Sequence, residues 1–211
     1  MSRNKGLSIL VALSLVAMLS GAAYADNVAY LGNPNLLQPG DYPGYSVGWE
    51  FTVGANPITV TKLGTYAGNN CDTPVGIFLT SSQALLTSTV VPNGSADIVT
   101  NSGIAYKYET LATPITLAAN TTYDVASVWV PGVWDTQGPI SVVSDPAITI
   151  IVGRYIGGSA NNTTLQFPTN IQGNSPGYLG SANFQFNVTP EPATMCLLVL
   201  GGIGALLRRR K

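Results

Sequence analysis

Histidine is absent from this chain of 211 residues. Its absence removes the most common general base in enzymes, the Ser-His and Cys-His pairs that activate nucleophiles, and the usual nitrogen ligands of zinc. Most hydrolase sites are thereby excluded. We predict that the protein is not an enzyme and has no cofactor.

Basic residues are scarce in the long central part of the chain. Residues 26–189 contain only Lys62, Lys107 and Arg154 as basic residues against nine acidic ones, a net charge of −6. Proteins that bind nucleic acid neutralise phosphates with clustered Lys and Arg. We therefore expect no nucleic-acid partner. These 164 residues are enough for one domain with a sizeable core.

Cysteine occurs twice, as Cys71 in a loop-like segment and as Cys196 in an apolar run near the C-terminus. A bond between them is improbable because the loop would have to reach the segment that we assign below to the membrane. Two interpretations of Cys71 stay open. It is a partly buried free thiol, or it forms a disulfide between molecules at the cell surface.

Long apolar runs are confined to the two ends. Near the N-terminus, two basic residues precede the apolar run Leu7–Leu19, and the small residues Ala23 and Ala25 follow it. This order is typical of a secretory signal peptide. We predict a signal peptide over residues 1–25 that signal peptidase removes before Asp26. The alternative is a permanent anchor, for which the run is short.

The C-terminal end has three parts, namely the sequence Pro190, Glu191 and Pro192, an apolar run from Ala193 to Leu207, and the basic residues Arg208, Arg209, Arg210 and Lys211. As a helix the run is about 22 Å long, against a hydrocarbon core of roughly 30 Å, which predicts a marginal transmembrane helix over 193–207. Its basic end remains cytoplasmic, so the preceding chain lies outside. The two prolines favour a non-helical segment in which a protease could read Glu191.

These three parts closely resemble the PEP-CTERM sorting signal of Gram-negative bacteria, here over residues 188–211. The resemblance implies transient anchoring in the inner membrane with the body in the periplasm. It also implies cleavage near residues 190–192 by an exosortase, followed by transfer to the outer surface or extracellular matrix of an exopolysaccharide-producing cell. This processing is similar to that of a GPI signal, whose apolar tail is also removed. An ordinary single-pass C-terminal anchor is the alternative.

The body between the two ends is a series of short segments with a period of two, separated by turns rich in Gly, Asn and Pro. The segments are Tyr45–Val53, Ile58–Tyr66, Val75–Leu79, Leu85–Val91, Ile104–Tyr108, Ile115–Leu117, Tyr123–Val130, Ile148–Tyr155 and Phe184–Val188. This pattern predicts an all-β fold, an antiparallel β-sandwich of jelly-roll type, over residues 26–187.

The body also resembles an uncharacterised β-domain that recurs in exported bacterial proteins. The resemblance rests on Gly48–Val53, Ile58–Gly64, Val75–Phe78 and Pro114–Tyr123, and it is looser over residues 131–182. Where that family commonly has Gly, this chain has Asn120, which also tolerates a left-handed backbone. The resemblance implies a sandwich and no established chemistry.

Two sets of acidic residues in the body could carry chemistry. The two glutamates, Glu50 and Glu109, could form an acid-base pair, but their spacing favours a solvated strand face. A calcium site is a weak possibility at Asp72, Asp135 and Asp145, although no Asp-x-Asp-x-Asp-Gly loop is present. We predict no metal site.

Aromatic residues are the feature that could recognise a sugar. Trp134 occurs in an expected loop, and together with Tyr42 and Tyr45 it could form a stacking platform for a glycan. Single aromatic residues of this kind more often pack at the rim of a core. The expected function is that of a noncatalytic surface or matrix protein associated with exopolysaccharide or biofilm; the alternative is a carbohydrate-binding or adhesive module.

Overall fold

The computed structural model describes residues 26–31, 37–39, 44–101, 104–129, 134–136, 143–159, 162–172 and 181–189. The predicted signal peptide, the predicted transmembrane helix over 193–207 and most of the sorting signal lie outside these ranges. The described parts of the chain contain strands and no helix long and apolar enough to cross a membrane. Residues 26–189 make up one compact unit.

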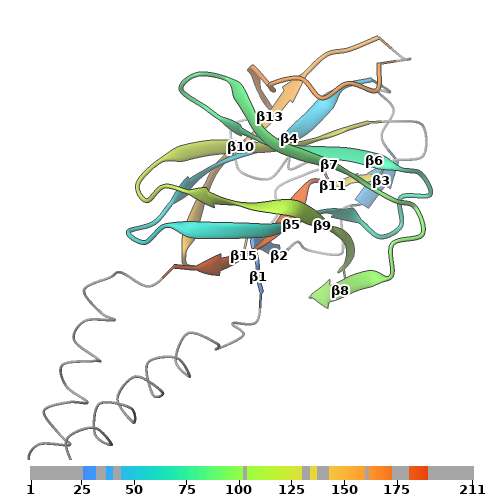
Figure 1. The fold of residues 1–211 in the computed structure, drawn as a ribbon. Helices are drawn as coiled ribbons and strands as arrows, with labels where there is room; N and C mark the ends of the chain where they lie inside the picture. The colour runs from blue at the N-terminus through green and yellow to red at the C-terminus, as the bar shows by residue number, and fades with distance from the viewer. Residues whose placement is uncertain are drawn as a thin grey trace, which may run out of the picture. The chain divides into compact units, whose positions relative to one another are not determined.

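Two antiparallel sheets form the body, as the predicted β-sandwich requires (Figure 1). The five-stranded sheet has the order β1-β15-β5-β9-β8 and the six-stranded sheet the order β14-β13-β4-β10-β6-β7. The chain passes repeatedly from one sheet to the other, which gives the jelly-roll-like character. Two further pairs, β11-β3 and β12-β2, lie outside the main sheets.

The strands of the five-stranded sheet are β1 (Asn27–Val28), β15 (Asn183–Val188), β5 (Ile58–Tyr66), β9 (Ile104–Leu117) and β8 (Asp97–Asn101). The strands of the six-stranded sheet are β14 (Asn170–Gln172), β13 (Ile148–Ile156), β4 (Ser46–Val53), β10 (Thr122–Val128), β6 (Thr73–Leu79) and β7 (Ala84–Val91). The small pairs consist of β11 (Trp134–Thr136) with β3 (Leu37–Pro39) and β12 (Val143–Ser144) with β2 (Tyr30–Leu31).

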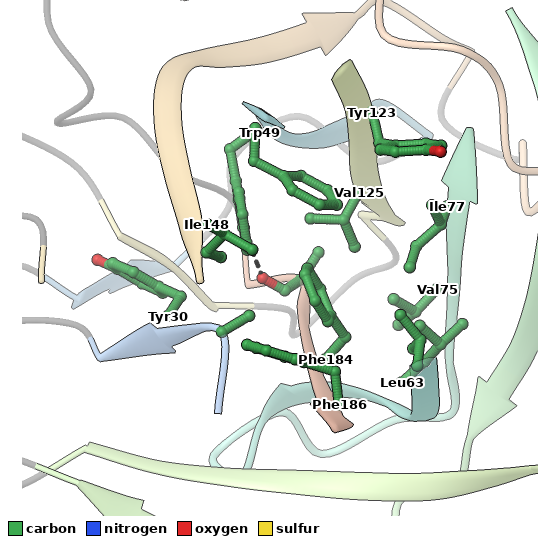
Figure 2. Close-up of a cluster of buried hydrophobic side chains, with 14 of the residues drawn as sticks. Tyr30, Trp49, Leu63, Val75, Ile77, Tyr123, Val125, Ile148, Phe184 and Phe186 are labelled. Carbon is green, nitrogen blue, oxygen red and sulfur yellow. Dashed lines mark hydrogen bonds between the residues drawn. The ribbon is translucent and has the colours of Figure 1, made fainter. Parts of the chain in front are cut away.

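The main core lies between the sheets and is rich in aromatic rings. Every second residue of β4 faces inward, so Trp49 and Phe51 meet Phe184 of β15, with ring centroids 5.6 and 5.0 Å apart. Figure 2 shows Trp49 and Phe184 among aliphatic side chains from both sheets, such as Leu63 of β5 and Val125 of β10. Trp49 Nε1 also donates to the carbonyl oxygen of Ala182 at 2.9 Å, which ties the sheets together.

A second, smaller cluster contains Val47 and Trp129, with Tyr45, Cys71 and Tyr155 packed against it. A buried polar group adjoins it through Ser127, which is paired with Val47. In this group the hydroxyls of Thr65 and Ser181 are 3.0 Å apart, and those of Ser127 and Ser181 are 3.2 Å apart. Buried hydroxyls therefore satisfy one another across the sheets.

Lys107 is 1 % exposed and enters the same polar region. Its Nζ donates to the carbonyl oxygens of Asn69 at 2.6 Å and of Asn93 at 3.3 Å. Burial lowers the pKa of this ammonium group, because water is removed from its charged form. The lysine therefore joins the loop after β5 to the turn after β7.

One predicted turn is confirmed at the start of β10. Asn120 adopts a positive φ of 53°, and its backbone N–H donates to Val53 and Gly54 at 3.0 Å. Asparagine tolerates this left-handed backbone better than most residues, so it can stand where glycine is common.

Candidate functional site

A charged group lies on the outer face of the six-stranded sheet. Asp124 of β10 is paired with Glu50 of β4, and Arg154 reaches both from β13. Arg154 Nε donates to Glu50 Oε2 at 2.8 Å, its Nη2 contacts the same oxygen, and Nε lies 3.8 Å from Asp124 Oδ1. Thr80 Oγ1 donates to Asp124 Oδ2 at 2.6 Å.

Residues 162–169, the covering segment, lie over this outer face. Phe167 packs edge-on against Phe78 with ring centroids 5.8 Å apart, the Gln166 N–H donates to Ser46 Oγ at 3.0 Å, and Arg154 Nη1 donates to the Thr169 carbonyl at 3.4 Å. The charged group is consequently enclosed, with Asp124 completely buried and Glu50 9 % exposed.

The expectation that Glu50 lies on a solvated strand face is therefore wrong. Its strand does alternate, but the covering segment packs over the face that we expected to be open. Glu109 is on β9 of the other sheet and does not join Glu50. The carboxylate beside Glu50 is Asp124, and both are largely shielded from solvent.

Burial dominates the electrostatics of this group. It raises the pKa of Asp124 to about 6. The hydrogen bond from Thr80 opposes this shift, the charge of Glu50 adds to it, and the charge of Arg154 opposes it. The guanidinium of Arg154 thus interacts with the carboxyl groups of both Glu50 and Asp124. Asp124, the more buried of the two, gains its proton at mildly acidic pH.

We expect Asp124→Asn to flatten the pH dependence of stability. Because the folded pKa is above the usual 3.8, ionisation of Asp124 costs the folded protein stability: the favourable contribution is complete below pH 3.8 and is lost as the pH rises through 6. About 2 kcal/mol of the change between pH 4 and pH 7 should disappear in the variant. Urea unfolding across this range measures it.

Thr80→Val is the matched comparison for that measurement. Removal of the hydroxyl takes away the hydrogen bond that lowers the pKa of Asp124. The pH at which stability falls should therefore move upward in Thr80→Val. An unchanged pH profile in Asp124→Asn would contradict the assignment.

A second candidate is a broad polar hollow of about 570 Å³ on the surface. Its lining residues are Gly157, Gly158, Ser159, Asn162 and Gln166. Asn162 is fixed there, since its Nδ2 donates to the Gly44 carbonyl at 3.2 Å and its Oδ1 accepts from the Thr164 N–H at 3.0 Å. Among the described residues, no charged side chain lines the hollow.

Two stacked tyrosines adjoin this hollow. Tyr45 and Tyr155 have ring centroids 6.3 Å apart and planes inclined by only 11°. A Cβ atom at Gly157 would lie 3.4 Å from the Tyr45 ring, so the ring borders the lining of the hollow. Uncharged hydrogen-bonding groups next to an aromatic face are the combination that suits a neutral sugar.

The predicted sugar platform has a different setting in the structure. Trp134 belongs to β11, opposite Pro39 of β3, so its placement in a loop was wrong. Tyr42 lies outside the described residues, and Tyr45 stacks on Tyr155. Sequence reasoning missed Tyr155 because its alternation on β13 indicated only an ordinary strand residue.

Two of the three aspartates considered as calcium ligands accept hydrogen bonds from backbone N–H groups. Asp72 Oδ1 accepts the Asn93 N–H and Asp145 Oδ1 accepts the Ala147 N–H, both at 2.8 Å. Asp135 is on β11. Within the part of the chain that the structure describes, no three Cys, Asp or Glu side chains gather in a way that could hold a metal ion.

Cys71 is half-buried and free, with its Sγ 3.8 Å from Thr73 Oγ1. This arrangement suits the free-thiol interpretation. A disulfide to another molecule stays a prediction.

The two ends of the body meet at neighbouring strands. Asp26, the predicted first residue after signal-peptide removal, accepts hydrogen bonds from Thr61 Oγ1 at 3.1 Å and Asn187 Nδ2 at 3.0 Å. At the other end the Thr189 N–H donates to the Pro57 carbonyl at 2.9 Å. The chain thus continues into the sorting signal directly from the end of β15. Ala23, Ala25, Pro190, Glu191, Pro192 and Arg208–Lys211 lie outside the described residues.

Comparison with known proteins identifies this C-terminal segment. Residues 188–211 match the family described as the PEP-CTERM protein-sorting motif. No curated protein matches the chain.

Proposed function

We propose that this PEP-CTERM protein is a noncatalytic component of the cell surface or extracellular matrix, associated with exopolysaccharide. The sorting motif at residues 188–211 carries the proposal, because it makes the chain an exported protein that an exosortase processes. The route to the surface is part of the proposal. Signal peptidase removes residues 1–25, and the tail anchors the protein in the inner membrane with the body in the periplasm. After cleavage of the tail, the body reaches the outer surface.

The body supports a noncatalytic role. Its buried carboxylates, Glu50 and Asp124, are enclosed by the covering segment and bound by Arg154. A general acid must reach the substrate within hydrogen-bond distance. A chain without histidine, whose paired carboxylates are enclosed, is better suited to a structural task.

Intact-mass analysis of the protein recovered from its own host tests the sorting route. In cells with exosortase we expect a chain that begins at Asp26 and ends near residues 190–192. Without exosortase, the chain should keep Arg208–Lys211. A wild-type mature chain that still carries these four residues would favour the single-pass anchor and overturn the proposal.

A carbohydrate-binding function is the second candidate, and the polar hollow beside Tyr45 and Tyr155 favours it. Binding of the exported protein to a glycan array should then fall at least tenfold in Gln166→Ala or Tyr155→Ala. Trp134→Ala is the matched comparison, since it tests the platform expected from sequence. Uniform absence of binding by the unaltered protein would remove this candidate.

A further inference from the structure

Strand β7 ends the six-stranded sheet and is the longest exposed edge of the sandwich. Among the described residues β6 is its only ladder partner, and β9 of the other sheet lies close to it without pairing. Three large apolar side chains on β7 are strongly exposed: Leu85 at 47 %, Leu86 at 42 % and Val90 at 50 %. An edge of this kind can pair with a strand of another molecule.

The edge lacks the charged side chains that usually block pairing. No ionisable residue occurs from Thr73 through Ala96. The other sheet edges are short or charged: β14 has three residues, β1 has two, and β8 contains Asp97, whose carboxylate is 2.9 Å from Lys62 Nζ. Natural proteins commonly protect edges by short length and by charge. Strand β7 has neither protection.

The sequence of β7 is nearly the same in both directions around Ser88. It has the order apolar, Thr, Ser, Thr, apolar from Leu86 to Val90. If two copies meet antiparallel with Ser88 opposite Ser88, Leu86 faces Val90 and Thr87 faces Thr89. Cross-strand pairs of both kinds stabilise a sheet. Leu86 is itself the extra residue of a bulge in the ladder with β6, so the new ladder ends at Leu86 in each copy.

We propose that a second copy of this chain pairs with β7 through residues 86–90, which joins two six-stranded sheets across a two-fold axis. Charge favours a copy as the occupant. Each body carries a net charge of −6, so two copies that meet at charged surfaces would place like charges opposite each other. An uncharged surface avoids this repulsion, and β7 provides one. Such an isologous contact closes as a dimer.

Disulfide capture in the exporting host tests the register. Residues opposite each other in an antiparallel pair have Cα atoms about 4.5 to 5.5 Å apart, within the range that a disulfide spans. We expect the full chain with Cys71→Ser and Ser88→Cys to form a disulfide-linked species of twice the monomer mass. The control, Thr100→Cys in the same background, is exposed on β8 and should remain monomeric.

Sedimentation of the exported protein gives the second readout. Unaltered protein should sediment as a dimer and Ser88→Lys as a monomer, because the variant places two ammonium groups at the axis. Monomeric Ser88→Cys, or a disulfide from it to a different protein, would overturn the proposal. Tail removal is read from the same samples by mass, so a failure of sorting can be distinguished from a failure to pair.

Discussion

Phe184→Ala should lower the free energy of unfolding by about 4 kcal/mol, because it removes a buried aromatic ring. Phe184 is completely buried on β15 and contacts Trp49 and Phe51 of the opposite sheet, as well as Phe186 at 5.7 Å between centroids. The variant loses the transfer free energy of the ring, and the surrounding rigid strands cannot close the cavity. Urea unfolding of the exported protein measures the loss.

Two control variants separate the cavity from other effects. Phe184→Leu keeps most of the volume and should cost less than about 1.5 kcal/mol. Ile98→Ala removes a side chain that is 54 % exposed and should change stability by no more than about 0.5 kcal/mol. Equal losses in Phe184→Ala and Ile98→Ala would show that Phe184 is not central to the core.

Arg154→Ala should destabilise the protein by about 3 kcal/mol at pH 7.5, because it leaves two carboxylates without their shared cation. The side chains are largely buried, with exposed fractions of 18 % for Arg154, 11 % for Glu50 and 0 % for Asp124. Arg154 also lowers the pKa of Asp124, so its removal raises that pKa further. The loss should therefore shrink as the pH falls toward 5 and Asp124 gains its proton.

The comparison variant for Arg154 is Lys62→Ala. Lys62 forms two ion pairs, with Asp26 at 3.4 Å and Asp97 at 2.9 Å, but it is more exposed. Its removal should cost at most about 1 kcal/mol. If Arg154→Ala costs no more than Lys62→Ala at both pH values, the enclosed group does not stabilise the sheet in the way described.

Local alternation was sufficient to predict most strands, because a half-buried strand needs an apolar residue at every second position. The segment Ile58–Tyr66 is observed as β5 with the same bounds. Two predicted strands, Ile104–Tyr108 and Ile115–Leu117, are instead parts of β9. A register shift there leaves Pro114 without a ladder partner, which removes the conflict that proline would otherwise create.

The enclosed charged group could not be predicted because it depends on contacts between distant segments. Arg154 is 104 residues from Glu50, and the covering segment is irregular, so no period marks it. The apolar residues on both faces of β10 were the available sign that its outer face is covered. The hollow likewise forms from the segment after β13. The composition of this segment does not indicate which way its side chains point.

The position of β15 determines how a pull on the membrane tail reaches the body. This strand lies between β1 and β5, and its last described residue, Thr189, leads straight into the sorting signal. Hydrogen bonds in antiparallel ladders run across the strands, so tension along β15 loads both ladders in shear and many bonds resist together. Drag on an anchored molecule is thereby spread over both ladders instead of breaking the hydrogen bonds of β15 one at a time.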